Sequence, residues 1–212
     1  FYDYIALDEV QTIRFSDENE IRGVLKSYLE SGTFNIGNYR GTAHASFVIL
    51  GNIPMRANRN PLRDFYFEEL PSVFRESALL DRFHGFIEGW HLPRFNTSLR
   101  VKGFALNVEY FSDILHQLRY RGEYSLYVES ILEIPPRSDA RDKRAILKLT
   151  TALLKLLFPN ALEKPLQGED LREFNNFCLL TAKRMRRIIK EQLSLIDPEY
   201  SNEVPSIELA KV

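Results

Sequence analysis

The 212-residue chain has a single cysteine, Cys178, and no long uncharged run. One thiol excludes an intrachain disulfide framework and a zinc site made of several cysteines, and it favours a reducing, cytoplasmic location. No uncharged stretch reaches the roughly 20 residues that a membrane-spanning helix needs, so we expect no membrane partner. The formal net charge of −1 gives the whole molecule no electrostatic preference for nucleic acid.

The composition instead supports a folded core, since 44% of the residues are hydrophobic and 12% are aromatic. In the first part of the chain, short apolar runs alternate with helical spacing. Residues 4–7 have the length of a strand, and residues 16–32 form a predicted helix that starts at Ser16 and stops at Gly32. This alternation is typical of an α/β fold with a parallel sheet covered on both faces.

The stretch 33–50 predicts a hairpin with its turn near Gly37-Asn38 or Arg40-Gly41 and a second arm that ends in the apolar run SFVILGN. Residues 65–83 look helical at both ends with a break at Pro71. FHGFIEGW, residues 83–90, is a candidate closing strand.

Beyond about Val101 the strand signals stop, and the sequence becomes helical in period. The helical segments cover residues 107–120, 124–134, 138–159 and 168–196. We therefore predict an α/β part followed by an all-helical part and a linker, with bounds 1–95, 96–196 and 197–212.

The opening stretch YIALDEVQTI carries Asp8 and Glu9 directly after an apolar run. The carboxyl end of a buried parallel strand is where open α/β sheets bind ligands. There, one carboxylate can hold a magnesium ion through water, and the other can orient a water that attacks a phosphate. In an equally acceptable interpretation, the two acids cap the next helix or pair with lysines.

Other polar residues follow at suggestive positions. Asn52 ends the apolar run FVILGN, where a side-chain amide can position the attacking water, although Gly51-Asn52 also reads as an ordinary turn. Arg82 in LLDRF can reach a neighbour's nucleotide and stabilise charge in the transition state, or it is a surface charge. The last helix carries the basic cluster KRMRRIIK.

Taken in order, these motifs resemble AAA+ ATPases of the branch that contains Lon proteases and MCM helicases. The stretches YLESGTFNIGNYRGTAHASFVILGN, ELPSVFRESALLDRFHGFIEGW and RRIIKEQLSLIDPEY are similar, more narrowly, to the Lon-like AAA+ proteins of BREX phage-defence systems. The resemblance covers nearly the whole chain. It implies the C-terminal part of a three-layer AAA+ core with an inserted β-hairpin, followed by a helical lid subdomain.

The resemblance also implies site roles and cofactors, namely ATP and Mg²⁺. Asp8 would hold the magnesium ion through water, Glu9 would be the hydrolytic carboxylate and Asn52 the first sensor. Arg82 would be an arginine finger acting in trans, with Arg75 as the second choice. The lid would supply a sensor arginine, for which the resemblance suggests Arg187 or else Arg186.

The same resemblance suggests partners. We expect a homo-oligomeric ring, as a hexamer or stacked rings, that acts on double-stranded DNA or on protein together with other phage-defence components. Asn38, Tyr39 and Arg40 at the hairpin tip would contact the polymer, with Tyr39 stacking and Arg40 meeting phosphate if that polymer is DNA. In the competing interpretation, these residues serve only the geometry of the turn and contact no polymer.

One departure from the family pattern stands out. No phosphate-binding loop G-x-x-x-x-G-K-[ST] occurs, and GNYRGTAH does not replace it. We expect that loop upstream of Phe1 in a longer protein, and we expect this fragment alone to be inactive as an ATPase. No Ser-Lys pair suits a protease, so we expect that this chain by itself does not cleave peptides. Whether the longer protein is an active protease stays open. The alternative function is a hydrolysis-deficient interaction or DNA-binding module.

Overall fold

In the computed structural model, which describes residues 3–210, the chain forms two compact units. The first unit comprises Phe1–His84 and Arg187–Val204, and the second comprises Gly85–Arg186 and Pro205–Val212. The start of the predicted core and the end of the predicted linker (residues 1, 2, 211 and 212) lie outside the described residues. Among the helices of the described part, none is both long and apolar enough to cross a bilayer.

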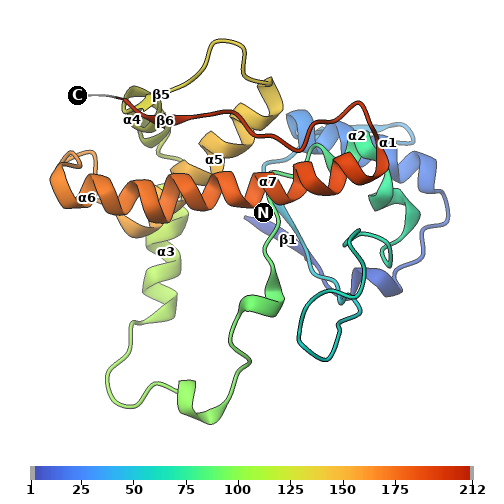
Figure 1. Cartoon of the computed structure of the whole chain (residues 1–212), viewed down its shortest axis with the longest axis horizontal. Helices are drawn as coiled ribbons and strands as arrows, with labels where there is room; N and C mark the ends of the chain where they lie inside the picture. The colour runs from blue at the N-terminus through green and yellow to red at the C-terminus, as the bar shows by residue number, and fades with distance from the viewer. Residues whose placement is uncertain (1–2, 211–212) are drawn as a thin grey trace. The chain divides into compact units, whose positions relative to one another are not determined.

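The first unit contains the opening strand of the chain and a long helix (Figure 1), after which three strands follow one another. Its elements are β1 (Tyr4–Leu7), η1 (Val10–Thr12), α1 (Glu18–Ser31), β2 (Thr33–Ile36), β3 (Tyr39–Thr42), β4 (Ser46–Ile49), η2 (Ser72–Arg75) and α2 (Ser77–Leu80). The last part of α7 (Leu180–Ile196) also belongs to it.

Helix α1 forms where the hydrophobic spacing predicts it. Its start differs by one residue, because Asp17 and not Ser16 is the N-cap and accepts hydrogen bonds from the N–H groups of Asn19 and Glu20. The predicted stop at Gly32 is confirmed. Gly32 has a φ of 73°, and its Cβ-less backbone lies against the carbonyl of Ala43, where an added Cβ would be 2.7 Å from the oxygen.

Strands β2 and β3 pair in antiparallel fashion around the turn at Gly37-Asn38. The predicted second arm of this hairpin is wrong in its last part, because β4 leaves β3 and pairs with β1 in parallel. The parallel sheet has two strands in the described part of the chain, and none of their residues is buried. Within the described residues the sheet is thus not fully covered on both faces, although Tyr28 of α1 lies against Phe47 of β4 with 5.2 Å between the ring centroids.

The second unit is mainly helical, with one two-residue strand pair. Its elements are η3 (Gly89–His91), η4 (Thr97–Leu99), α3 (Val108–Arg119), α4 (Glu123–Ser130), β5 (Leu132–Glu133), α5 (Ala140–Leu157), α6 (Gly168–Glu173), the π-helix η5 (Phe174–Leu179), the first part of α7 and β6 (Glu208–Leu209). Its core is apolar and comes mostly from α4, α5 and η5. It includes Tyr124, Val128, Ala145, Ile146, Leu154, Phe174 and Leu179.

The predicted closing strand 83–90 is wrong. The Phe86 N–H donates to the carbonyl of Met185 in α7 at 3.2 Å, so this segment packs on a helix, and within residues 3–210 it pairs with no strand. Gly85 permits the close approach, because a Cβ there would lie 2.8 Å from Cβ of Met185 and 3.0 Å from Cδ1 of Leu149. Of the other predicted helical stretch, 65–83, only Ser77–Leu80 is α-helical.

Candidate functional site

The ends of β1 and β4 lie at one edge of the parallel sheet. Leu7 pairs with Ile49 in register, and the Leu50 N–H donates to the Leu7 carbonyl at 2.8 Å. The ladder continues past both strands, since the Val10 N–H donates to the Leu50 carbonyl at 3.0 Å. Asp8 and Glu9 therefore leave β1 at the same edge at which Asn52 follows β4, as expected for the carboxyl ends of parallel strands.

A side-chain contact that the sequence did not reveal joins these two ends. The backbone N–H of Asn52 donates to Oε1 of Gln11 at 3.2 Å. Gly51 makes room for this contact, because a Cβ there would lie 3.2 Å from Cγ1 of Val10 and 3.1 Å from Cδ2 of Leu70. The partners are 41 residues apart in sequence, so no local pattern could have identified Gln11.

The backbone at the acidic pair is unusual. Glu9 has φ 47° and ψ 42°, the left-handed region that a residue with a Cβ rarely occupies. Oδ1 of Asp8 accepts the Glu9 N–H at 2.8 Å, which supports this conformation. Asp8, Glu9 and Asn52 are all exposed, so their side chains are accessible to a ligand at this edge. Strain of this kind concentrates at functional sites.

The two arginines considered for a role in trans differ in accessibility. Arg82 donates to the Ala78 carbonyl and forms an ion pair with Glu30 of α1, Nε to Oε2 at 3.4 Å, and its side chain is 17% exposed. Within residues 3–210 it makes no hydrogen bond or ion pair with Asp8, Glu9 or Asn52. Arg75, at the end of η2, is exposed and donates to the Glu68 carbonyl at 3.3 Å.

The two adjacent arginines of α7 also differ. Arg186 is fully buried, and its Nε lies 2.6 Å from Oδ1 of Asp142 in α5. Separating a buried guanidinium from its carboxylate is costly, so Arg186 is not free to meet a phosphate. Arg187 is exposed. Of the two sensor candidates, Arg187 is thus the accessible one, and its role stays a prediction.

Comparison with known proteins decides the family. Residues 1–206 match the family described as "Lon-like protease BrxL-like, ATPase domain". The chain belongs to this family. The resemblance to the Lon-like AAA+ proteins of BREX systems is thereby confirmed, and the chain is an ATPase domain of the BrxL-like kind.

Two relatives are similar over most of the chain. The chain is 29% identical over 192 residues to Lon-like protease BrxL of Escherichia coli O9:H4 (strain HS) and 30% identical over 196 residues to Lon-like protease BrxL of Bacillus cereus (strain H3081.97). These alignments cover 91% and 92% of the chain but only 26% and 28% of the relatives. The chain thus spans about a quarter of the length of these relatives.

A BrxL-like ATPase domain implies use of a nucleotide, and the residues of the acidic edge can be compared with the needs of a magnesium ion. Mg²⁺ keeps several waters and takes few protein ligands, usually one or two carboxylates beside phosphate oxygens. Asp8 is exposed and has one carboxylate oxygen beyond the one that accepts the Glu9 N–H. No group of three or more His, Cys, Asp or Glu residues that could hold a metal occurs among residues 3–210.

The hairpin tip of this BrxL-like domain is solvent-exposed. Tyr39 is 67% exposed, Asn38 and Arg40 are also exposed, and Nε of Arg40 donates to Oδ1 of Asn35 at 3.1 Å. The Tyr39 ring lies 6.0 Å from the ring of Phe34, which anchors one side of it. These positions permit contact with a polymer, and the predicted contact itself stays a prediction.

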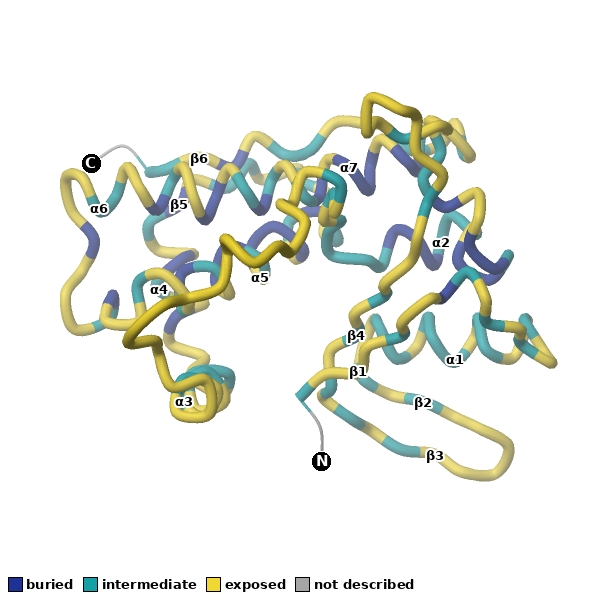
Figure 2. The backbone as a smooth tube through the Cα atoms, turned by 90° about the horizontal axis from the view of Figure 1, so that it is seen from below, coloured by how far each residue is buried: buried dark blue, intermediate teal, exposed yellow. Residues whose placement is uncertain are grey.

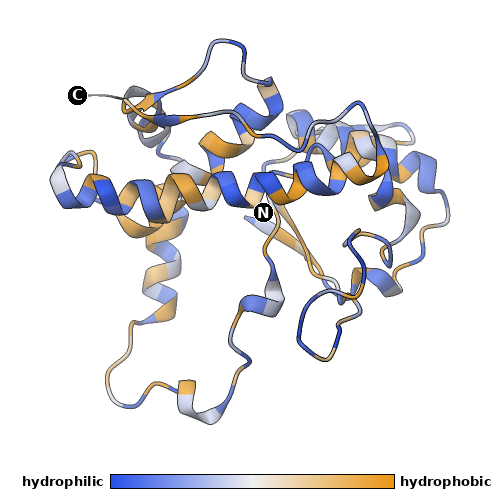
Figure 3. Ribbon diagram, viewed as in Figure 1, coloured by the Kyte–Doolittle hydropathy of each residue, from blue (hydrophilic) through white to orange (hydrophobic). Residues whose placement is uncertain are grey.

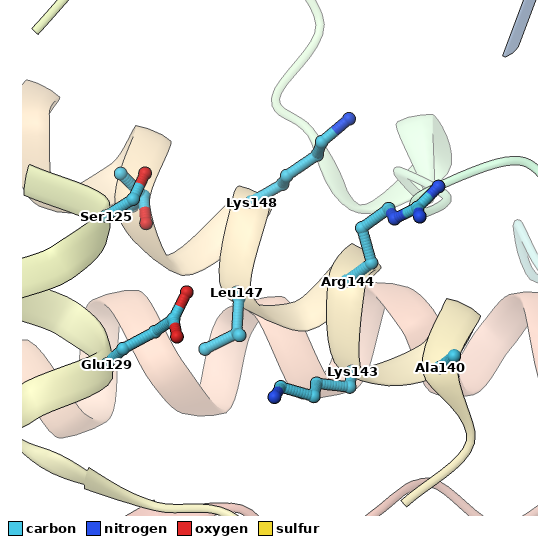
Figure 4. A pocket seen from close by; sticks show the side chains of 8 residues that line it. Ser125, Glu129, Ala140, Lys143, Arg144, Leu147 and Lys148 are labelled. Carbon is cyan, nitrogen blue, oxygen red and sulfur yellow. The ribbon is translucent and has the colours of Figure 1, made fainter. Parts of the chain in front are cut away.

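A cavity of about 310 Å³ lies between α4 and α5 of the second unit (Figure 4). The residues that line it are Ser125, Glu129, Ala140, Lys143, Arg144, Leu147, Lys148 and Thr151. None of the predicted site residues is among them, so the cavity is separate from the candidate site.

The single thiol takes no part in this chemistry. Cys178 is fully buried within the π-helix η5, and burial raises its pKa to about 12. Only the thiolate is a good nucleophile, so Cys178 is inert near neutral pH and acts as a small apolar core residue.

Proposed function

We propose that the edge formed by Asp8, Glu9 and Asn52 hydrolyses ATP in a ring of identical chains. The observation that carries this proposal is the hydrogen-bonded junction after β1 and β4. Val10 to Leu50 at 3.0 Å and Asn52 to Gln11 at 3.2 Å keep the two strand ends together. Two carboxylates and an amide at one edge of a sheet are the kinds of group that the hydrolysis of a terminal phosphate requires.

Each group has a distinct role in the proposal. Asp8 holds Mg²⁺ through water, and the bound ion supplies positive charge to the phosphates. Glu9 accepts a proton from the attacking water or orients it, and the Asn52 side chain positions that water against the terminal phosphate. In this proposal residues 1–95 are the C-terminal part of a three-layer AAA+ core with β2–β3 as its inserted hairpin, and residues 96–196, which include α3 to α7, form the lid.

The arginines act on the nucleotide from other positions. Arg82 serves as the finger toward a neighbour's nucleotide, which requires it to leave Glu30. The exposed Arg75 is the second choice. Arg187 senses the nucleotide from the lid. A positive charge at the terminal phosphate stabilises the transition state and is worth about 10³-fold or more in rate.

The polymer on which the ring acts is DNA or protein, in phage defence. The exposed Tyr39 and Arg40 suit DNA, whereas the printed name of the relatives, Lon-like protease, suits a protein substrate. Binding of the full-length protein to duplex DNA, measured between 50 and 200 mM salt, separates the two, because phosphate contacts weaken steeply with salt over about this range.

Substitution Glu9→Gln in the full-length protein tests the hydrolytic assignment. We expect the ATPase rate to fall at least about 100-fold while ATP still binds, because the amide cannot accept a proton. Glu20→Gln, an exposed acid in the first turn of α1, is the matched control and should retain the wild-type rate. A Glu9→Gln protein that hydrolyses ATP at the wild-type rate contradicts the proposal.

One observation favours the hydrolysis-deficient alternative. Arg82 is only 17% exposed and is paired within its own chain, which is unlike a finger that is ready to act in trans. If the full-length wild-type protein assembles and binds ATP but shows no turnover, this alternative is correct. Turnover that is lost on Arg82→Ala and retained on Arg75→Ala supports the active assignment.

A further inference from the structure

The segment that leads from η3 into α3 is exposed along its whole length. Every residue from 91 to 110 is exposed, and the tube ahead of α3 is drawn in the exposed colour (Figure 2). We call residues 92–107 the arm. Its six large apolar side chains are all more than two-fifths exposed, and Phe104 is 107% exposed. They are Leu92, Phe95, Leu99, Val101, Phe104 and Leu106.

The arm combines these apolar groups with charge of one sign. Arg94, Arg100 and Lys102 lie in it, and it contains no Asp or Glu. Hydrophobic and hydrophilic stretches alternate along this loop (Figure 3). Contiguous exposed apolar groups with basic residues between them are typical of an interaction surface, since aromatic and arginine side chains are enriched at protein interfaces.

The charge of the chain is divided unequally between its units. The residues of the first unit include 16 acids and 11 bases, a net charge of −5, whereas those of the second unit include 13 acids and 17 bases, a net charge of +4. The basic arm belongs to the second unit. The first unit of another copy of the same chain therefore has a net charge opposite in sign to that of the arm.

The apolar content favours protein over nucleic acid as the occupant. Four of the six large side chains are aliphatic, and bases stack on aromatic rings, not on Leu or Val. Burial of six such side chains removes on the order of 600 Å² from water, most of the roughly 800 Å² that each partner of a standard interface buries.

We propose that the arm docks on the acidic first unit of a second copy of the chain. The contact joins unlike surfaces, so it is heterologous and repeats from copy to copy. Apolar burial by Phe95 and Phe104 supplies the attraction, and Arg94, Arg100 and Lys102 set the orientation against acids. The inference rests on the proposed function, in which identical chains assemble, and it identifies the segment that forms the contact between them.

A photo-cross-linking experiment tests the occupant directly. Phe104 of the full-length protein is replaced by p-benzoylphenylalanine, and unlabelled and ¹⁵N-labelled protein are mixed before irradiation. We expect cross-linked peptides of mixed isotope that join position 104 to residues within 3–84 or 187–204. Cross-links within one copy, to the second unit of another copy or to DNA would overturn the proposal.

Substitutions test the energetic contribution of the arm. Arg100→Glu with Lys102→Glu should raise the dissociation constant of the assembly by about tenfold or more, measured by mass photometry. The matched control is Lys164→Glu with Arg172→Glu, two exposed bases of the second unit outside the arm, which should change it less than about twofold. Phe104→Ser should weaken assembly in the same way, and Leu126→Ser, an apolar residue 71% exposed on α4, should not.

These variants alter exposed side chains, so their thermal unfolding should match that of the wild type. A weaker assembly can then be attributed to the lost contact and not to misfolding. Arm variants that assemble like the wild type, or a wild-type protein that stays monomeric, overturn the proposal. Glu9→Gln should lose ATPase activity and still assemble through the arm, because Glu9 lies outside residues 92–107. A protein that hydrolyses ATP but whose position 104 cross-links to another surface refutes the docking of the arm and leaves the proposed function intact.

Discussion

At Gln11 a single side-chain oxygen holds the backbone N–H of Asn52 at 3.2 Å. If Asn52 positions the attacking water, Gln11 is a positioning residue. We expect Gln11→Leu in the full-length protein to lower kcat for ATP by about threefold to tenfold and to leave KM within about twofold, because small misplacements of a catalytic group reduce rate more than binding.

Gln11→Glu keeps an oxygen acceptor at the same place and should restore most of kcat. A merely structural role would instead lower the thermal stability of both variants without this split between kcat and KM. Steady-state kinetics on the two variants, with Asn52→Ala for reference, therefore decides the role. Equal losses in the Leu and Glu variants would contradict it.

Asp142 and Arg186 form a buried ion pair with 2.6 Å between Oδ1 and Nε. Asp142→Ala leaves a buried guanidinium without its carboxylate, so we expect the free energy of unfolding to fall by about 3–5 kcal/mol. Urea denaturation followed by circular dichroism measures this loss.

The matched control is Asp170→Ala, which removes an exposed pair whose Oδ2 lies 3.9 Å from Nζ of Lys164. Exposed pairs contribute about 0–1 kcal/mol, so this variant should differ little from the wild type. Similar losses in the two variants would show that Arg186 has no special dependence on Asp142.

At the scale of elements, the segment after His84 packs on α7 through Gly85. Gly85→Ala places a methyl group 2.8 Å from Cβ of Met185, and we expect it to destabilise the chain by about 1–3 kcal/mol through overpacking. Gly89→Ala is the control, because nothing lies within 4 Å of its added Cβ. Thermal unfolding of both variants is the measurement, and an unchanged Gly85→Ala midpoint would contradict the packing argument.

Elements with local signals were predictable, and elements that depend on distant partners were not. Helix α1 follows from its apolar spacing and its Gly32 stop. The predicted strand at 83–90 failed because the Phe86 N–H bonds to Met185, far away in sequence, and no local pattern encodes that choice. The partner of β4 was misjudged for the same reason, since a strand pattern does not specify its neighbour.

At the scale of the whole molecule, the candidate edge was accessible from the sequence because parallel strands place their carboxyl ends together. Asp8, Glu9 and Asn52 follow from that rule, whereas Gln11 needed coordinates. The sequence could not choose between Arg186 and Arg187 either. Neighbouring residues on a helix point in different directions, and only packing shows that Arg186 is buried while Arg187 is exposed.

The unequal charges of the two units also matter at this scale. A heterologous contact between a basic arm and an acidic unit closes into a ring when the rotation between copies allows it, and otherwise continues as a filament. Its strength should decrease with added salt to the extent that exposed charges contribute.

The left-handed backbone of Glu9 has a consequence for engineering. A glycine would adopt φ 47° without the penalty of roughly 1–3 kcal/mol that such a conformation costs other residues. Directed evolution for heat resistance should therefore favour glycine at this position, at the cost of the Glu9 carboxylate. If Glu9 is the hydrolytic carboxylate, as proposed, a library selected for thermal tolerance alone would accumulate stable variants that do not hydrolyse ATP.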